Sequence, residues 1–377
     1  EVVRGAGEAH VPWVIDWVRE TKAPEGFGLD PTIYGPYHTG GTDKEVVLPV
    51  IREEAQHLMI SIEKQDAQTG KIPQGEASLA GAVFALKAAA DIVHPDGMTG
   101  VLYRKGDLVA ELVTDAEGRA SVDRDSKGNP LYFGTYELTE TKAPAGYVRD
   151  TELHLEISAV YNPDKAEQKM VYVFAGTVSD DVIRQRVILH KISDAHTEPA
   201  EELAGVGFRF YSAKKLCEAN GVDSCYELPQ KNGVWDLEAM KLEGCETVIG
   251  EHGETELFTD RHGKIKTIPL VYGMYLVVES TPADGFQAGT PFLIQVPTIL
   301  TTDENGQESD LHEIDYLPEE AMEIPVINWP AKAYLQIEKL DAKTGERILQ
   351  ANTEFQILKK DGTPVTQIGW DGVKEYK

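Results

Sequence analysis

Cysteine is scarce in this chain of 377 residues, and its three copies lie in one segment. Cys217, Cys225 and Cys245 allow one disulfide with one thiol left over, and the sequence does not choose among the three pairings. Disulfides therefore cannot hold the whole chain together, and we favour a single bridge that pins this segment. No histidine lies near these cysteines at the spacing that zinc requires, and no base for a catalytic thiol is evident. We expect no metal site and no cofactor.

Positive charge is also in short supply. The chain has 36 Lys and Arg against 63 Asp and Glu, which gives a formal net charge of −27. This balance argues against nucleic acid and against anionic membrane surfaces as partners, because both require clustered basic residues. No apolar run is long enough to span a bilayer, and we find no phosphate-binding loop, serine-hydrolase motif or paired-histidine site. The chain begins with Glu1 and shows no signal peptide, so we expect a fragment of a longer protein.

Two short phrases recur along the chain and indicate internal repeats. The first is glutamate, a short spacer, proline, and then glycine followed by an aromatic residue; its glutamates are Glu20, Glu140 and Glu279. The second is apolar-x-apolar-x-Lys followed closely by aspartate; its lysines are Lys64, Lys191 and Lys339. Each unit opens with the lysine phrase and carries the glutamate phrase late. Since repeats of this kind define the architecture, the chain is predicted to contain two complete units and two partial ones.

We place the complete units at residues 57–183 and 184–331. Residues 1–56 are then the back half of an earlier unit, and residues 332–377 the front half of a later one. The joins are short and contain no Gly- or Ser-rich linker, so the array is expected to be stiff.

Within each unit, short alternating apolar runs separated by hairpin turns predict an all-β fold of tandem antiparallel β-sandwich domains. A Thr-Asp-x-x-Gly turn occupies matching places before each glutamate strand, at 114–118 and 259–263. The second complete unit is longer, and its extra residues read as an insertion between strands. One short helix is predicted in this region, at 236–242.

Period-two alternation puts each repeated lysine and glutamate on the apolar face of its strand. The plainer interpretation is a buried salt bridge or a lysine that snorkels at a strand end. A third position favours a reactive site over a simple salt bridge. Asp180 lies eleven residues before Lys191, and Asn328 lies eleven residues before Lys339. Burial favours the neutral, nucleophilic amine of a lysine, and a protonated carboxyl group can polarise a carbonyl and move the proton. Such a set can form an isopeptide bond, with loss of ammonia from Asn or water from Asp.

These phrases resemble the Cna B-type or SpaA-type (prealbumin-like) domains of Gram-positive surface adhesins and pilins. In that family a Glu-x-x-Ala-Pro-x-Gly-Tyr box carries the assisting glutamate. The resemblance implies one bond in each complete unit: Lys64 to Asp180 with Glu140 as catalytic residue, and Lys191 to Asn328 with Glu279 as catalytic residue. Glu20 and Lys339 would belong to the incomplete units.

The chain departs from the family pattern in three places. Arg52 stands where the first, partial unit would carry its amide, so no bond is expected there. In the first complete unit Asp181 or Asn162 could compete with Asp180. The third box lacks the usual Ala-Pro pair and reads Ser280-Thr281-Pro282.

The resemblance implies a structural stalk on the cell surface, in the cell wall of a Gram-positive bacterium. Its chemistry would be single-turnover and intramolecular, so the chain would not be an enzyme in the usual sense. Its expected partners are neighbouring repeats of the same protein, with sortase anchoring outside this fragment and no membrane insertion within it. The alternative is a binding module, in which the insertion of the second complete unit recognises a host matrix protein or glycan.

Overall fold

The computed structural model describes residues 15–38, 50–193, 201–297, 323–328, 337–348, 355–358, 362–364, 366–369 and 372–375. These residues form β-strands with one α-helix, which confirms the predicted all-β class. They fall into two compact units, the first made mostly of residues up to Gln185 and the second mostly of residues from Arg186 onward. No helix within the described ranges has the length and apolar character needed to cross a membrane.

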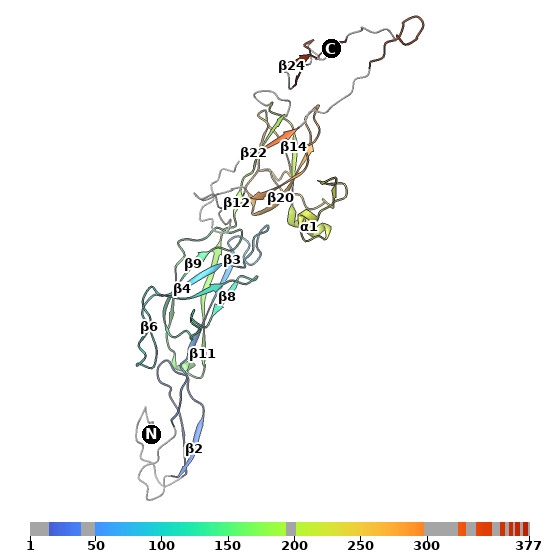
Figure 1. Ribbon diagram of the computed structural model, residues 1–377. Helices are drawn as coiled ribbons and strands as arrows, with labels where there is room; N and C mark the ends of the chain where they lie inside the picture. Colours follow the sequence, from blue (N-terminus) through green and yellow to red (C-terminus); the bar gives the residue numbers. More distant parts are fainter. Residues whose placement is uncertain are drawn as a thin grey trace. The chain divides into compact units, whose positions relative to one another are not determined.

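The first unit is a sandwich of two sheets, with strand orders β10-β9-β4-β7 and β11-β3-β8 (Figure 1). Two hairpins, β1-β2 and β5-β6, accompany it. Its elements are β1 (Ile15–Arg19), β2 (Ile33–His38), β3 (His57–Asp66), β4 (Val83–Ala88), β5 (Ile92–Val93), β6 (Val101–Tyr103), β7 (Leu108–Val113), β8 (Arg119–Val122), β9 (Gly134–Lys142), β10 (Leu155–Ala159), the 3-10 helix η1 (Pro163–Lys165) and β11 (Met170–Asp180).

Strand β3 shows how alternation builds the core and the site together. Its inward residues Leu58, Ile60 and Ile62 are completely or almost completely buried, and they pack with Phe84 of β4 and Leu138 of β9. Burying each such side chain contributes about 1.5–3 kcal/mol. Lys64 continues the same face, and its side chain is fully buried. The predicted placement of this lysine on the apolar face is therefore confirmed.

Strand β11 runs parallel to β3, although β3 pairs with β8 in the antiparallel sense. Val178 is the register partner of Lys64, so Asp180 lies two residues further along and projects from the same face as Val178. The first and last strands of the sandwich are thus neighbours, and their parallel register is not apparent from strand alternation alone. This register brings a residue from the end of the unit to the lysine near its beginning.

The second unit repeats this plan, with sheets ordered β17-β14-β20-β21 and β18-β13-β22 (Figure 1). Here β13 and β22 are the parallel pair, and Val326 is the partner of Lys191. The remaining elements of the chain are β12 (Arg184–Gln185), β13 (Ile188–Ser193), β14 (Gly207–Ser212), α1 (Ala213–Asn220), the 3-10 helix η2 (Cys225–Glu227), β15 (Gln230–Lys231), β16 (Val234–Trp235), β17 (Glu256–Phe258), β18 (Lys264–Lys266), β19 (Leu270–Val271), β20 (Gly273–Thr281), β21 (Phe292–Val296), β22 (Glu323–Asn328), β23 (Thr366–Gly369) and β24 (Gly372–Glu375).

The helix of the second unit is α1, and the prediction of a helix at 236–242 is wrong. Residues 236–242 form turns and irregular backbone. Helix α1 begins where the Ser212 side chain accepts a hydrogen bond from the amide of Lys215, and it ends at Gly221, which has a left-handed φ of 68°. Both are standard capping signals.

Candidate functional site

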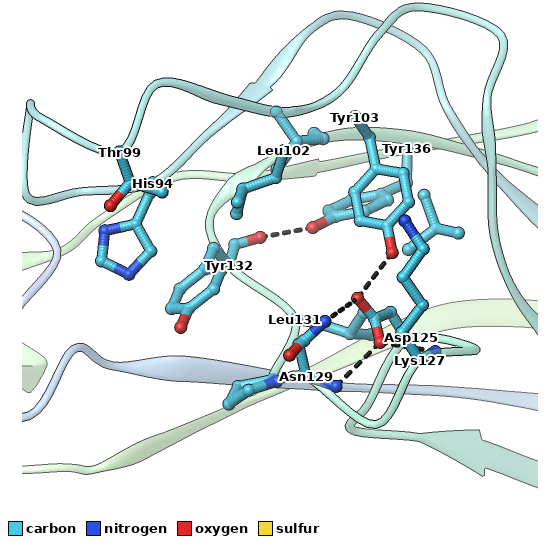
Figure 2. A pocket seen from close by; sticks show the side chains of 13 residues that line it. His94, Thr99, Leu102, Tyr103, Asp125, Lys127, Asn129, Leu131, Tyr132 and Tyr136 are labelled. Atoms are coloured by element: carbon cyan, nitrogen blue, oxygen red, sulfur yellow. Dashed lines mark hydrogen bonds between the residues drawn. The ribbon is translucent and has the colours of Figure 1, made fainter.

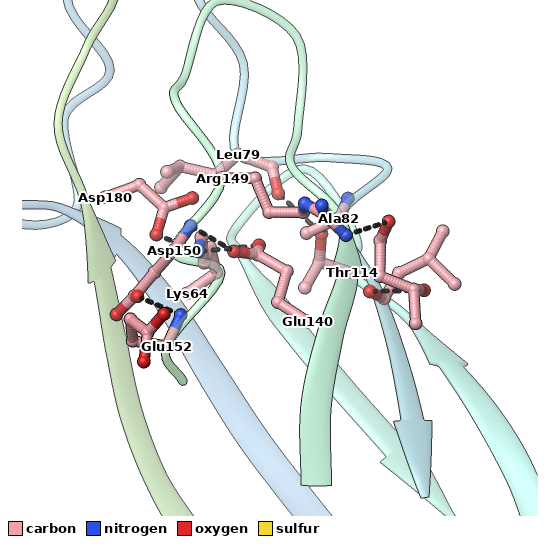
Figure 3. Close-up of polar contacts among 11 residues, drawn as sticks. Lys64, Leu79, Ala82, Thr114, Glu140, Arg149, Asp150, Glu152 and Asp180 are labelled. Carbon is pink, nitrogen blue, oxygen red and sulfur yellow. Dashed lines mark hydrogen bonds and ion pairs between the residues drawn. The ribbon is translucent and has the colours of Figure 1, made fainter. Parts of the chain in front are cut away.

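The first unit brings Lys64, Glu140 and Asp180 together in its core. The Lys64 Nζ lies 2.7 Å from Glu140 Oε1 and 2.5 Å from Asp180 Oδ1, and all three side chains are fully buried. Figure 3 shows the lysine between the two carboxyl groups. Strands β3, β9 and β11 each contribute one residue, so the set forms only when the whole sandwich is assembled.

The second unit brings Lys191, Glu279 and Asn328 together in the same way. The Lys191 Nζ lies 2.5 Å from Asn328 Oδ1 and 3.1 Å from Glu279 Oε2. The Asn328 amide Nδ2 donates to Glu279 Oε1 at 2.6 Å. One glutamate therefore contacts both the amine and the amide nitrogen.

An aromatic ring lies beside each lysine in the core. Phe84 is the register partner of Glu140, and the Lys64 Nζ is 5.6 Å from its ring centroid. In the second unit Phe208 is the partner of Glu279, and Lys191 Nζ is 5.9 Å from its ring. Such a ring stabilises an ammonium group electrostatically and excludes water from one side of it. Sequence reasoning missed both aromatics, although each lies in an apolar strand that follows its lysine phrase.

The Oε2 atom of each box glutamate accepts a hydrogen bond from the backbone amide ten residues later. The distances are 3.4 Å from the Asp150 amide to Glu140 and 3.1 Å from the Gly289 amide to Glu279. The same contact occurs in the partial unit, where the Asp30 amide lies 2.6 Å from Glu20. The loop after each box thus fixes the orientation of its carboxyl group.

Burial shifts the proton equilibria of both sites toward neutral groups. In the first unit, burial raises the pKa of Glu140 to about 7 against the opposing effect of the Lys64 charge. Burial also raises the pKa of Asp180. In the second unit, burial lowers the pKa of Lys191. Since low dielectric surroundings disfavour charged forms, both cores favour proton transfer from the amine to a carboxyl group.

Of the three acceptors considered for the first unit, the structure brings only Asp180 to the lysine. Asp181 is exposed on the opposite side of the backbone. Asn162 is also exposed, and its side chain accepts a hydrogen bond from the Asp164 amide at the start of η1.

The acceptor position of the first partial unit is Glu53, one residue beyond the predicted Arg52. Arg52 is exposed. Glu53 lies eleven residues before Lys64, the same spacing that separates Asp180 from the next repeated lysine. Burial raises the pKa of Glu53, and the negative charge of Glu20 and a hydrogen bond to it raise this pKa further. Glu20 therefore does have a partner at the acceptor position, and that partner is a carboxyl group.

The last partial unit is only partly within the described residues. Lys339 is exposed there, and its neighbour Leu340 forms an isolated bridge with Arg347. The expected lysine strand begins at Leu335, which lies outside the described residues, as does most of 332–377.

The three cysteines are thiols in the structure, which does not contain the disulfide suggested by their number. Cys225 and Cys245 are buried, and Cys217 is half-buried at helix α1. The Cys245 Sγ donates to the backbone oxygens of Lys241 and Glu243 in its own loop. Burial raises the pKa of this thiol. Cys245 is thus held as a protonated core residue.

A cavity with a volume of about 340 Å³ lies in the first unit (Figure 2). Its polar groups are paired with one another: Tyr103 and Asn129 both donate to Asp125, and the Tyr136 hydroxyl donates to the Tyr132 carbonyl. Asp125 also accepts hydrogen bonds from the backbone amides of Lys127 and Asn129, so this segment is a capped hairpin turn. No metal-binding cluster of His, Cys, Asp or Glu occurs in the described part of the chain.

Comparison with known proteins gives one family match, which lies within the first unit. Residues 59–169 match the family model of the SpaA prealbumin-like fold domain. The matched stretch includes Lys64 and Glu140 but ends before Asp180. No curated protein sequence matches the chain.

Several solved structures are similar to the chain at low sequence identity. The Bacillus anthracis TIE protein is 19% identical, with a TM-score of 0.43; the match covers 83% of this chain and 41% of that one. The chain therefore spans less than half of that protein. The minor pilin of Streptococcus agalactiae is 15% identical (TM-score 0.26, 74% of this chain and 99% of that one). The shaft pilin SpaA of Lactobacillus rhamnosus GG is 14% identical (TM-score 0.22, with the same coverage). Matches at this level assign no function.

Proposed function

We propose that each complete unit closes an intramolecular isopeptide bond, from Lys64 to Asp180 and from Lys191 to Asn328. The observation that carries this proposal is the repetition of one buried constellation. In both units a lysine on the first strand meets a carboxyl or amide group two residues beyond its register partner on the last strand, and a glutamate contacts the lysine. A salt bridge alone does not require an amide at this position. Burying an ion pair also has a desolvation cost, which lowers stability.

In the second unit Glu279 is positioned to move the proton. It accepts a proton from the Lys191 ammonium, and the neutral Nζ attacks Cγ of Asn328. A C–N bond forms, Glu279 passes its proton to Nδ2, and the Cγ–Nδ2 bond breaks with loss of ammonia. Glu279 then accepts a second proton from Nζ, which becomes the N–H of the new amide. The contacts of Glu279 with both nitrogens support this path. One amine and one amide thus give one new amide and one ammonia.

In the first unit the leaving group is water. The Lys64 amine attacks Cγ of Asp180, and one Asp180 oxygen leaves with two protons. The reaction requires an uncharged acid. Burial raises the pKa of Glu140 to about 7, so Glu140 supplies one near neutral pH, and burial also raises the pKa of Asp180. Neither Asp180 oxygen has a hydrogen-bond partner of normal geometry among the described residues, so this carboxyl group relies on the lysine for its stabilisation.

Intact mass spectrometry of the purified chain tests the proposal. The mass should fall short of the sequence mass by one ammonia plus one water, because each unit releases one small molecule. Peptide mapping should then recover the lysine and acceptor strands of each unit as branched peptides. A chain at its full sequence mass would contradict both bonds, and a deficit of one molecule would identify the unit that reacts.

Exchange of the acceptor gives a sharper prediction. Asp180→Asn should have the same final mass as the natural chain, because loss of ammonia from Asn and loss of water from Asp leave the same amide. The neighbouring variant Asp181→Asn is the matched control, and its mass should differ from the natural chain by the substitution itself. Equal behaviour of the two variants would remove Asp180 from the acceptor role.

Such bonds suit a stalk. A link between the first and last strands restrains the unfolded chain and transmits tension across the sandwich without separating the strands. We therefore infer a structural stalk in a cell-surface adhesin or pilus-like protein of a Gram-positive bacterium, without multi-turnover activity and with anchoring by a sortase. The match of residues 59–169 to the SpaA prealbumin-like fold domain supports this role. The insertion at 213–250 exposes Tyr226 on its surface, and a host matrix protein or glycan partner for it stays a prediction.

A further inference from the structure

The Thr-Asp-x-x-Gly turn that recurs in the sequence contacts the backbone of each repeated lysine. The carbonyl of Gly118 accepts a hydrogen bond from the Lys64 amide at 2.6 Å, and the carbonyl of Gly263 accepts one from the Lys191 amide at 2.7 Å. The two turns lie in different units, so the same contact has been formed twice. The proposed reaction does not use either turn directly.

Both glycines approach the lysine backbone more closely than any other residue could. A Cβ atom on Gly118 would lie 2.3 Å from the Lys64 carbonyl oxygen, and one on Gly263 would lie 2.4 Å from that of Lys191. The φ angles of these glycines are +75° and +67°. A side chain here would push the lysine strand away by roughly half an ångström or more, since real Cβ contacts are essentially never below 3.0 Å.

The aspartate that recurs in both turns holds each turn in place. The Asp115 Oδ1 accepts backbone hydrogen bonds from Glu117 and Arg119, and Asp260 Oδ1 accepts the same two from His262 and Lys264.

The buried threonine ties the turn to the strand that carries the aromatic ring. Thr114 Oγ1 donates to the Leu79 carbonyl and accepts from the Ala82 amide, just before β4 (Figure 3). Thr259 Oγ1 makes the equivalent bonds to Leu203 and Val206, just before β14. Each turn is therefore fixed at both ends before it meets the lysine.

We infer that this turn, at 114–118 and 259–263, is the positioning element for the reacting lysine of each unit. The inference rests on the proposed isopeptide chemistry. The turn fixes the position of the lysine backbone. This position determines where Nζ lies relative to the acceptor carbon. A displacement of about 1 Å in a reacting group can reduce a rate by roughly a hundredfold.

The test is the rate of bond formation in Gly263→Ala, measured by cell-free synthesis of the full chain and intact mass at timed intervals. Loss of ammonia should slow by roughly tenfold or more, while loss of water from the first unit should proceed as in the natural chain. Gly253→Ala is the matched control, because Gly253 also has a left-handed φ, +88°, but a Cβ there would have no atom within 4 Å. The control should keep its rate of ammonia loss.

A second substitution separates close approach from backbone strain. Asparagine tolerates a left-handed φ but still carries a Cβ, so Gly263→Asn should react as slowly as Gly263→Ala. Recovery of the natural rate in Gly263→Asn would overturn the inference, because φ alone would then explain the glycine. An unchanged rate in Gly263→Ala would overturn it as well. If the natural chain shows no mass deficit at all, the proposed function fails first.

A third variant tests the turn even if the glycine variants misfold, because it removes hydrogen bonds from the turn and keeps the glycine. Asp260→Ala keeps Gly263 and removes two backbone hydrogen bonds from the turn. Ammonia loss should slow several-fold while hydrogen exchange in β14 and β20 shows a folded unit. Natural kinetics in this variant would contradict a positioning role for the turn.

Discussion

Replacing Glu279 with alanine is expected to abolish the loss of ammonia and to lower the stability of the second unit by about 5 kcal/mol. Glu279 contacts the amine of Lys191 and the amide nitrogen of Asn328, so its removal eliminates the proposed proton path. The crosslink would span 137 residues of sequence, and the entropy lost by closing a loop of that size in the unfolded chain sets the magnitude. Intact mass and differential scanning calorimetry measure the two effects.

The first unit supplies the control for this experiment. Glu279→Ala should still lose one water, because the Lys64 site is complete without it. The reciprocal variant Glu140→Ala should lose ammonia and retain its water. Ammonia loss that persists in Glu279→Ala would remove this glutamate from its assigned role. Loss of the bond without loss of stability would show that the crosslink contributes little to the native fold.

The faces of the strands could be predicted from the sequence because alternation is a local property. Lys64 follows Leu58, Ile60 and Ile62 at a spacing of two, and the structure buries all four. The parallel register of β3 with β11 could not be predicted in this way, because it joins segments more than a hundred residues apart. The only sign of this register in the sequence was the separation of eleven residues between each acceptor and the next repeated lysine.

Two errors have physical explanations. Residues 236–242 have good helix formers, but seven residues nucleate a helix poorly without caps. Their backbone is instead tied to α1, where the Asn220 side chain bonds the backbone of Lys241 through both its oxygen and its nitrogen. At the first partial unit, counting from the apolar run placed Arg52 at the acceptor position. The spacing to Lys64 places Glu53 there, and burial of that carboxyl group agrees with the second count.

Removing the lysine of the first unit should make its stability depend strongly on pH. In Lys64→Met no bond can form, and Glu140 and Asp180 remain in the core without a positive partner. Burial already raises the pKa of Glu140 to about 7 from an ordinary value of 4.5, and loss of the Lys64 charge removes an opposing effect. The folded state then holds a proton that the unfolded chain releases above pH 4.5. Stability is therefore fully present below pH 4.5 and falls as the pH rises toward 7, by about 3 kcal/mol or more.

Calorimetry at pH 5 and pH 8, with hydrogen exchange in β3 and β9 to identify the unit that unfolds, measures this slope. The double variant Lys64→Met/Glu140→Gln should lose the part of the pH dependence that Glu140 contributes and keep the part from Asp180, whose pKa burial also raises. Lys71→Met is the surface control; its side chain is 65% exposed and pairs with Glu63, so its removal should change little. Equal stability of Lys64→Met at the two pH values, or an undiminished slope in the double variant, would contradict a buried Glu140 with a raised pKa. Since that raised pKa also supplies the acid for the reaction at Asp180, the same measurement bears directly on how the first bond forms.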